Sequence, residues 1–189
     1  MKPATRNALI LLFLPTDLVG QAAPVPLAYS CAAPVAAAAD VRSCLGLRNI
    51  SRHPLGGDSL EIRVWHDVAV SGVTLVRIVR ARGSWTAQSY GAQRWGRTVE
   101  VDTVATSRPW EDGYRDAVTA GMLNLSRLPA STDPVPRSDG EWFVLEWSTN
   151  GTFREAFTNT PASCRVPSDR HLIDILLVLG AISQGCPSH

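Results

Sequence analysis

The chain has 189 residues, with 18 basic and 17 acidic side chains and a formal net charge of +1. This length fits one domain with its own core, and the balanced charge gives no reason to expect nucleic acid or an anionic membrane as a partner. Lys2 is the only lysine. Lysine-based covalent catalysis and a lysine-bearing phosphate loop are therefore excluded from the rest of the chain.

The first 22 residues are typical of a signal peptide. Lys2 and Arg6 give a basic start, and an apolar run from Ala8 to Leu14 follows. Gly20-Gln21-Ala22 matches the small-residue pattern of a cleavage site. The run is much shorter than the roughly 20 residues of a membrane-spanning helix. We therefore expect removal of residues 1–22, no transmembrane segment in the mature chain, and a periplasmic or secreted protein.

Four cysteines in an exported chain favour two disulfides: Cys31, Cys44, Cys164 and Cys186. The first two flank an alanine-rich segment and the last two flank an apolar one, and both segments are predicted helices. The ends of a helix of about 15 residues stand about 22 Å apart, whereas bridged Cα atoms lie within about 7 Å. We therefore expect each N-terminal cysteine to bond to a C-terminal one. Free thiols, local bridges and a lipoprotein acylated at Cys31 are the alternatives.

Residues 23–58 are predicted to form an arm, unstructured at first, with a short helix, and residues 59–189 an α+β domain. Alternation of apolar and polar residues from Leu60 to Ala81, around Ser71-Gly72, indicates a β-hairpin. A turn at these two residues sets Val70 opposite Val73, and a wider loop from Asp67 to Val73 would change the pairing near the tip only. The buried face then holds Ile62, Val64, Val68, Val70, Val73, Leu75, Val79 and Ala81. The opposite face should meet solvent.

Two more strands, 85–90 and 98–104, are expected next. Ser107-Arg108-Pro109 then indicates the start of a helix that ends near Gly121, because a hydroxyl can cap a helix and proline fits its first turn. A last, buried helix is predicted over residues 172–182.

Residues 141–158 predict a second hairpin that turns at Asn150-Gly151. A two-residue turn would set Glu146 opposite Glu155, so we expect a three-residue turn that sets Glu146 against Arg154. The core face would then hold Phe143, Leu145, Trp147, Phe153 and Phe157. The outer face would hold Trp142, Val144 and Glu146.

These elements predict the α+β class, with a single antiparallel sheet of about five or six strands built from hairpins, and two or three helices packed on it. The segments SLEIRVWHD, TLVRIVRARG, NLSRLP, DGEWFVLEW and NGTFREAF, with the last apolar helix, resemble a set of small exported bacterial proteins of unknown activity. The resemblance covers residues 59–183, and DG-x-W-x-x-LE is its most specific part. It implies a single antiparallel α+β domain and carries over no functional residue.

Polar side chains interrupt both expected core faces. His66 and Arg77 would oppose each other in the first hairpin, and Glu155 would lie on the aromatic face of the second. Because buried charge is costly unless it is paired, we expect an Arg77–Glu155 ion pair with His66 beside it. Such a group could fix the strand order, line a ligand pocket or serve as an acid/base site.

Trp65 and Trp142 are expected on the outer faces of the two hairpins. An exposed aromatic surface would suit a protein or a glycan of the cell envelope, unless a helix covers it.

The sequence contains no cofactor fingerprint, metal-ligand cluster or catalytic motif. We therefore expect neither a cofactor nor a metal, and an exported binding or interaction module rather than an enzyme. The alternatives are a small cofactor-independent periplasmic hydrolase that uses His66 and Glu155, and a purely structural envelope component.

Overall fold

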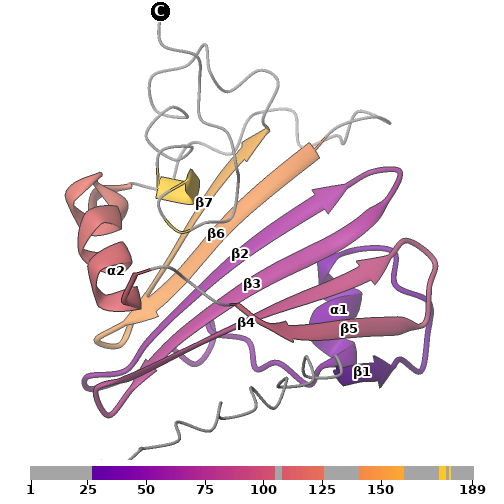
Figure 1. Ribbon diagram of the computed structural model, residues 1–189, viewed down its shortest axis with the longest axis horizontal. Coiled ribbons are helices and arrows are strands. Elements are labelled where there is room, and N and C mark those ends of the chain that lie inside the picture. The colour runs from indigo at the N-terminus through magenta and orange to yellow at the C-terminus, as the bar shows by residue number, and fades with distance from the viewer. Residues whose placement is uncertain (1–26, 105–107, 126–140, 160–174, 178, 180–189) are drawn as a thin grey trace, which may run out of the picture.

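The computed structural model describes residues 27–104, 108–125, 141–159, 175–177 and 179. Within them, one antiparallel sheet has seven strands in the order β1-β5-β4-β3-β2-β6-β7 (Figure 1). The strands are β1 (Leu27–Ser30), β2 (Leu60–Val68), β3 (Gly72–Ala81), β4 (Ser84–Gln93), β5 (Thr98–Thr103), β6 (Glu141–Thr149) and β7 (Thr152–Asn159). The helices are α1 (Ala38–Cys44), α2 (Trp110–Thr119) and the 3-10 helix η1 (Met122–Asn124). The single antiparallel sheet is confirmed, with seven strands rather than five or six.

Different parts of the chain cover the two faces of the sheet. On the α2 face, apolar side chains of the sheet pack against α2, η1 and the helical residues 175–177; this core includes Leu60, Ile62, Val64, Ile78, Phe143, Leu145, Trp147, Ala117, Met122, Ile175 and Leu176. On the α1 face, Val35 and α1 pack against Trp65, Val73, Leu75, Tyr90, Val99 and Val101. The remainder of the predicted last helix lies outside the described residues.

Helix α2 ends as the sequence predicts. Its last turn closes at Ala120, and Gly121 follows with a φ of 98°. Glycine adopts this left-handed conformation readily and is a common helix terminator. Pro109 is the N-cap residue, and it makes no side-chain capping hydrogen bond. The predicted capping residue, Ser107, lies outside the described residues.

The pairing of the first hairpin differs from the expected one. Val68 pairs with Gly72, and Ala69 to Ser71 form the loop, so the predicted pairing of Val70 with Val73 is wrong. The change in register is an odd number of residues, which turns every β3 side chain to the other face. Both faces of β3 carry apolar side chains, so either register buries a core. Val70 is 76 % exposed at the loop.

The residues that the sequence pattern assigned to a single buried face are therefore divided between the two faces of the sheet. Ile62 and Val64 lie in the core of the α2 face, whereas Val73 and Leu75 lie in the core of the α1 face. Ala81, expected to be buried, is exposed.

The second hairpin has the two-residue turn rather than the expected three-residue one. Thr149 pairs with Thr152, and Asn150 and Gly151 have φ values of 49° and 72°. Two left-handed residues give a turn whose twist matches that of the strands, which explains the preference for Asn-Gly. Glu146 consequently lies opposite Glu155.

The aromatic side chains of this hairpin divide between the faces as a result. Phe143, Leu145 and Trp147 are buried on the α2 face as expected. Phe153 and Phe157 are instead on the α1 face. Side chains alternate along β7, and Ala156 is in the core of the α2 face, so the odd-numbered residues of β7 lie on the other face.

Cys31 and Cys44 form a disulfide with each other, with a Cα–Cα distance of 5.1 Å. The expectation that each would bond to a C-terminal cysteine is therefore wrong. The helix begins only at Ala38, and the preceding residues fold back on the sheet, where the Val35 N–H donates to the Gly96 carbonyl at 2.8 Å. Cys164 and Cys186 lie outside the described residues. The arm, expected to be unstructured over residues 23–34, contributes β1, which pairs with β5.

Candidate functional site

The structure does not bring the predicted site together. His66 lies on the α2 face, where its ring stacks on that of Phe143 with centroids 4.2 Å apart and planes within 9° of parallel. Its neighbour across β3 is Thr74 rather than Arg77. Arg77 lies on the α1 face and donates to Glu61 at 2.6 Å. The expected opposition of His66 and Arg77 is therefore wrong, because of the register of the first hairpin.

The predicted Arg77–Glu155 ion pair is also wrong, because the two residues lie on strands that are not neighbours. Both residues belong to one cross-strand row of the α1 face, but Arg63 and Glu146 stand between them. Three strand spacings separate the two backbones by about 14 Å. Glu155 and His66 are on opposite faces, so the acid/base pair of a hydrolase is not assembled from them.

The tryptophans expected to form an exposed surface are both covered to some extent. Trp65 is 2 % exposed, because α1 packs over it. Its indole N–H donates to Glu146 at 2.9 Å, and the guanidinium of Arg42 lies 5.2 Å from its ring centre. Trp142 is half-buried with its ring 4.9 Å from that of Phe157. Its Nε1 has no hydrogen-bond partner in the part of the chain that the structure describes.

A group of charged side chains lies between α1 and the sheet, and we call it the arginine–glutamate cluster. Glu61, Arg63 and Glu146 are buried, and Arg42 of α1 and Arg77 are partly exposed. Glu61 accepts from Arg63 at 2.8 Å and from Arg77 at 2.6 Å. Glu146 accepts from Arg42 at 2.7 Å. The predicted solvent exposure of this face is wrong, because the N-terminal arm covers it.

The cluster is suited to holding the fold together rather than to proton transfer. Burial alone would raise the pKa of the Glu61 carboxyl, but the hydrogen bond from Arg77 and the positive charges of Arg63 and Arg77 hold that pKa below its ordinary value of 4.5. A general acid or base near neutral pH needs a shift in the opposite direction. Arg63 also donates to the Arg48 carbonyl at 2.9 Å, so the cluster fixes the chain that follows α1.

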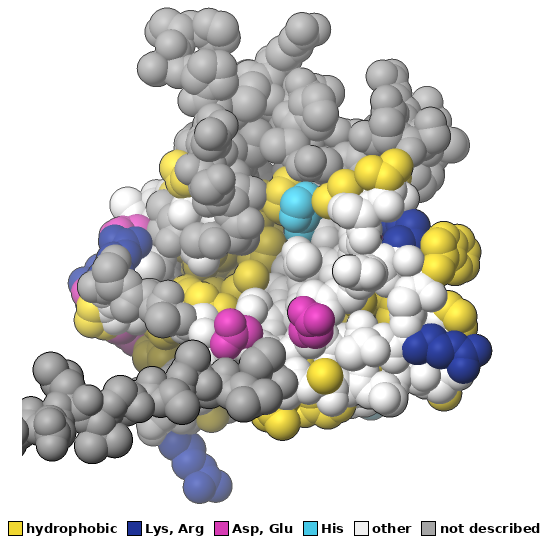
Figure 2. Space-filling view, turned by 45° about the vertical axis from the view of Figure 1, so that its right-hand side comes forward, with side chains coloured by type: hydrophobic (Ala, Val, Ile, Leu, Met, Phe, Trp, Pro, Cys, Tyr) yellow, Lys and Arg dark blue, Asp and Glu magenta, His cyan; other side chains and the backbone are white. Residues whose placement is uncertain are grey.

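An open groove of about 610 Å³ lies on the α2 face, at the corner of the sheet that the described helices do not cover. One cross-strand row runs through it, from His66 on β2 to Thr74 on β3, Gly91 on β4 and Glu100 on β5. The groove is lined by His66, Val68, Ser71, Gly72, Val73, Thr74, Gly91, Ala92, Gln93, Gly96, Arg97, Thr98 and Glu100. In Figure 2 this part of the surface is mostly polar, with a histidine above it and acidic side chains below.

The floor of the groove is low because of Gly91. A Cβ placed on Gly91 would meet no atom within 4 Å, so a larger side chain there would project into open space. Thr74, beside it, is exposed. Together these two residues leave the backbone of β3 and β4 accessible to a ligand.

The walls of the groove have different chemistry. His66 forms one wall, and Phe143 supports the inner side of its ring. Glu100 forms the other wall and is exposed, with Thr98 beside it on the same strand. Arg97 adds a positive charge at the end of the groove. The site therefore offers an exposed carboxylate, guanidinium, amide and hydroxyl groups, together with the partly buried imidazole of His66.

Sequence reasoning recognised only His66 among these residues. Two signals were present for the others. Thr98, Glu100 and Asp102 alternate with valines, which indicates a strand with one wet face. Gly91 was expected just after the strand over residues 85–90, whereas β4 continues to Gln93, and a glycine inside a strand often marks close approach of a ligand or backbone.

The described residues contain no group of three or more His, Cys, Asp or Glu side chains placed to hold a metal ion. No helix within the same ranges has the length and apolar character to cross a membrane.

Comparisons of the chain with models of protein families, with curated proteins and with solved structures found no match.

Proposed function

We propose that this is an exported binding protein and that the groove on the α2 face takes a saccharide, such as a glycan of the cell envelope. The observation that carries the proposal is the row His66–Thr74–Gly91–Glu100. It keeps a polar, glycine-floored surface on a face whose other half is apolar and covered by α2. A surface of this kind contributes nothing to the core, and recognition explains it.

The lining of the groove suits a ligand rich in hydroxyl groups. Each sugar hydroxyl both donates and accepts hydrogen bonds. Ser71, Thr74 and Thr98 can do both as well, Glu100 accepts, and Arg97 donates. The imidazole of His66, held flat by Phe143, offers a face against which the C–H groups of a sugar ring can pack. A volume of about 610 Å³ lies within the usual range of ligand sites.

Two features of the chain that are typical of exported proteins support a ligand outside the cytoplasm. Residues 1–22 have the features of an export signal. The Cys31–Cys44 disulfide is of a kind that persists in oxidising compartments. A periplasmic or secreted protein meets envelope glycans directly.

Binding is better supported than hydrolysis. His66 and Glu100 stand at opposite ends of the row, about 14 Å apart at the backbone. Most glycosidases use two carboxyl groups that flank the bond they cleave. Among the described residues that line the groove, only Glu100 carries a carboxyl group.

The test is a titration of the isotope-labelled protein with chitotetraose, cellotetraose and maltotetraose, followed by NMR. At least one saccharide should shift the backbone amide signals of Thr74, Gly91 and Glu100 and leave those of α1 unchanged. A Gly91→Val variant should fold and lose this binding, because the added side chain fills the floor.

Thr86→Val is the matched control, since Thr86 is exposed on the opposite face of the same strand. It should bind as the wild type does. The proposal fails if none of the three saccharides moves the groove signals, or if Gly91→Val binds as well as Thr86→Val.

A further inference from the structure

The loop between β4 and β5 displays a tryptophan to solvent. Trp95 is 70 % exposed and has a φ of 64°. The left-handed conformation is uncommon for any residue other than glycine and is a genuine outlier for a bulky side chain. Such a conformation persists only where the surroundings impose it, and it occurs often at ligand-binding positions.

The segment closed by the disulfide imposes this conformation. The Trp95 N–H donates to the Val35 carbonyl at 2.6 Å, and the Val35 N–H donates to the Gly96 carbonyl at 2.8 Å. The Cys31 N–H donates to the Arg97 carbonyl at 2.8 Å. Three backbone hydrogen bonds therefore hold the loop against the segment that begins at Cys31.

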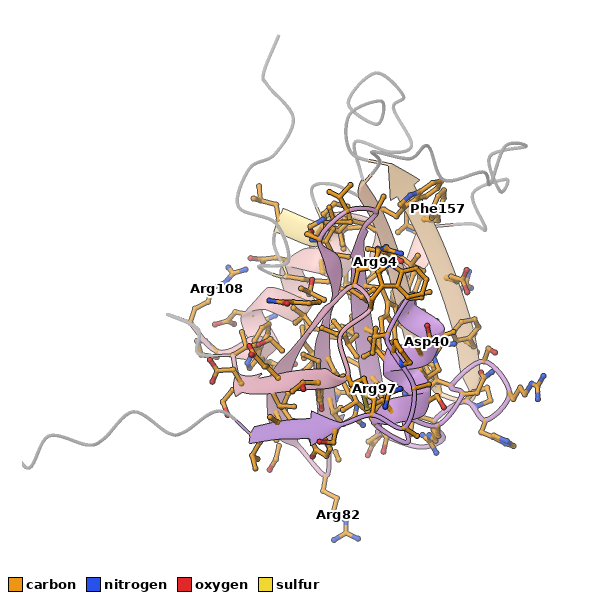
Figure 3. The ribbon with its side chains drawn as sticks, turned by 90° about the vertical axis from the view of Figure 1, so that its right-hand side faces the viewer. Asp40, Arg82, Arg94, Arg97, Arg108 and Phe157 are labelled. Carbon is orange, nitrogen blue, oxygen red and sulfur yellow. A yellow bond between two sulfur atoms is a disulfide. The ribbon has the colours of Figure 1, made fainter. Side chains whose placement is uncertain are left out.

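The same loop forms the rim of the groove. Gln93, Gly96 and Arg97 line the groove, and Trp95 lies between them in the chain. Arg94 is directed elsewhere: it binds Asp67 and the Val68 carbonyl, and it donates to the Ala36 carbonyl at 2.5 Å. Figure 3 shows Arg94 and Arg97 one above the other on the side of the molecule that faces the viewer.

We infer that Trp95 is an outer subsite of the groove, a platform on which a further ring of an oligosaccharide stacks. The inference rests on the proposed function and deepens it, since it makes the ligand a chain of sugars rather than a single one. An indole presents a broad flat surface to the C–H groups of a sugar, and its N–H can donate to a hydroxyl. Gln93 and Arg97 flank Trp95 in the sequence at two residues' distance and line the groove, so they can supply polar contacts to a sugar that reaches from the groove to Trp95.

The experiment compares the disaccharide and the pentasaccharide of the sugar series that binds most tightly in the titration above. Replacement of Trp95 by glycine removes the ring and keeps a residue that accepts the left-handed backbone. We expect Trp95→Gly to bind the pentasaccharide about five- to tenfold more weakly and to bind the disaccharide unchanged. Trp95→Phe should recover most of the affinity.

Val70→Ala is the matched control, because Val70 is an apolar residue exposed on the neighbouring loop. It should bind both saccharides as the wild type does. In the wild type, the indole N–H signal that Trp95→Gly eliminates should shift with the pentasaccharide only.

The outcomes separate the two proposals. Binding in the groove that does not depend on Trp95, or that weakens equally for both chain lengths, overturns the subsite and leaves the groove in place. Absence of any saccharide binding by the wild type overturns the proposed function, and the subsite with it.

Discussion

Glu61 and Arg63 form an ion pair 2.8 Å long inside the protein, with side-chain exposures of 3 % and 1 %. They are two residues apart on β2 and point to the same face, beneath the N-terminal arm. Glu61 also binds Arg77, and Arg63 also binds the carbonyl of Arg48. A charged strand face that would usually meet water is therefore part of the interior.

The buried pair makes Glu61 important for stability. A Glu61→Gln variant removes the carboxylate 2.8 Å from the buried Arg63 and leaves it only the more distant Glu146 at 4.0 Å, and we expect it to lose about 3–5 kcal/mol of unfolding free energy. Urea denaturation followed by tryptophan fluorescence measures this. The control is Asp112→Asn, which removes a mostly exposed ion pair with Arg115 and should cost less than about 1 kcal/mol. Equal losses in the two variants would contradict the burial of the pair.

Acid should weaken the protein through the same carboxylate. The pKa of Glu61 lies below 4.5 in the folded state and returns to about that value on unfolding. Between the two values the unfolded state binds more protons, so stability rises with pH there and falls as pH decreases through the folded pKa. The stability difference between wild type and Glu61→Gln should therefore narrow as pH is lowered from about 6 to about 3. A difference that stays constant or widens over this range would count against this prediction.

The disulfide should stabilise the folded state, because it closes a loop of the chain. Cys31 and Cys44 are separated by 13 positions, and a bridge over a loop of this size contributes about 3 kcal/mol to stability. A Cys31→Ala, Cys44→Ala double variant should lose about that amount in urea denaturation. Peptide mapping of the unreduced protein checks the connectivity. A peptide that joins Cys31 to Cys164 or Cys186 would show that the pairing is different.

Gly72 should not tolerate a side chain. A Cβ at this position would lie 2.1 Å from the carbonyl oxygen of Ala92, and Gly72 has a φ of 149°. We expect Gly72→Ala to lower the unfolding free energy by about 1–3 kcal/mol in thermal or urea denaturation, because β3 and β4 must move apart. Gly56→Ala is the control: its Cβ would meet no atom within 4 Å, and we expect a change within about 0.5 kcal/mol. A tolerated Gly72→Ala would show that the two strands are not held this closely.

The sequence predicted the strands well and their faces less well. Alternation located β2, β3, β6 and β7, and the burial of Val64 and Phe143 is confirmed. In each hairpin, the length of the turn determines which side chains of the second strand face which side of the sheet. In the first hairpin both registers bury valines and leucines, so the pattern could not choose between them.

The second hairpin shows how a distant contact changes a local choice. The expected register avoided placing Glu146 opposite Glu155. In the structure Glu146 accepts hydrogen bonds from Arg42 and Trp65, which stabilise its charge on the side away from Glu155. The intrinsic preference of Asn150-Gly151 for a two-residue turn then prevails. Arg42 comes from the arm, and nothing near residue 146 in the sequence indicates its presence.

The candidate site was hidden for a related reason. His66, Thr74, Gly91 and Glu100 come from four strands and meet only through the pairing of those strands. Each strand was predicted, but the order of the strands in the sheet was not. The alternation of β5 with valines was not used to assign a solvent-facing side, and only the register shows that Thr98 and Glu100 lie on the same face as His66 and Gly91.

The strands that form the groove divide their residues between two tasks. Thr74, Gly91 and Glu100 point into the groove, while their neighbours Leu75, Tyr90 and Val101 point into the core of the opposite face. For the binding function that we propose, substitutions in the first set would change the ligand while the second set maintains the sheet. Such a scaffold can acquire new specificities in evolution at little cost to its ability to fold.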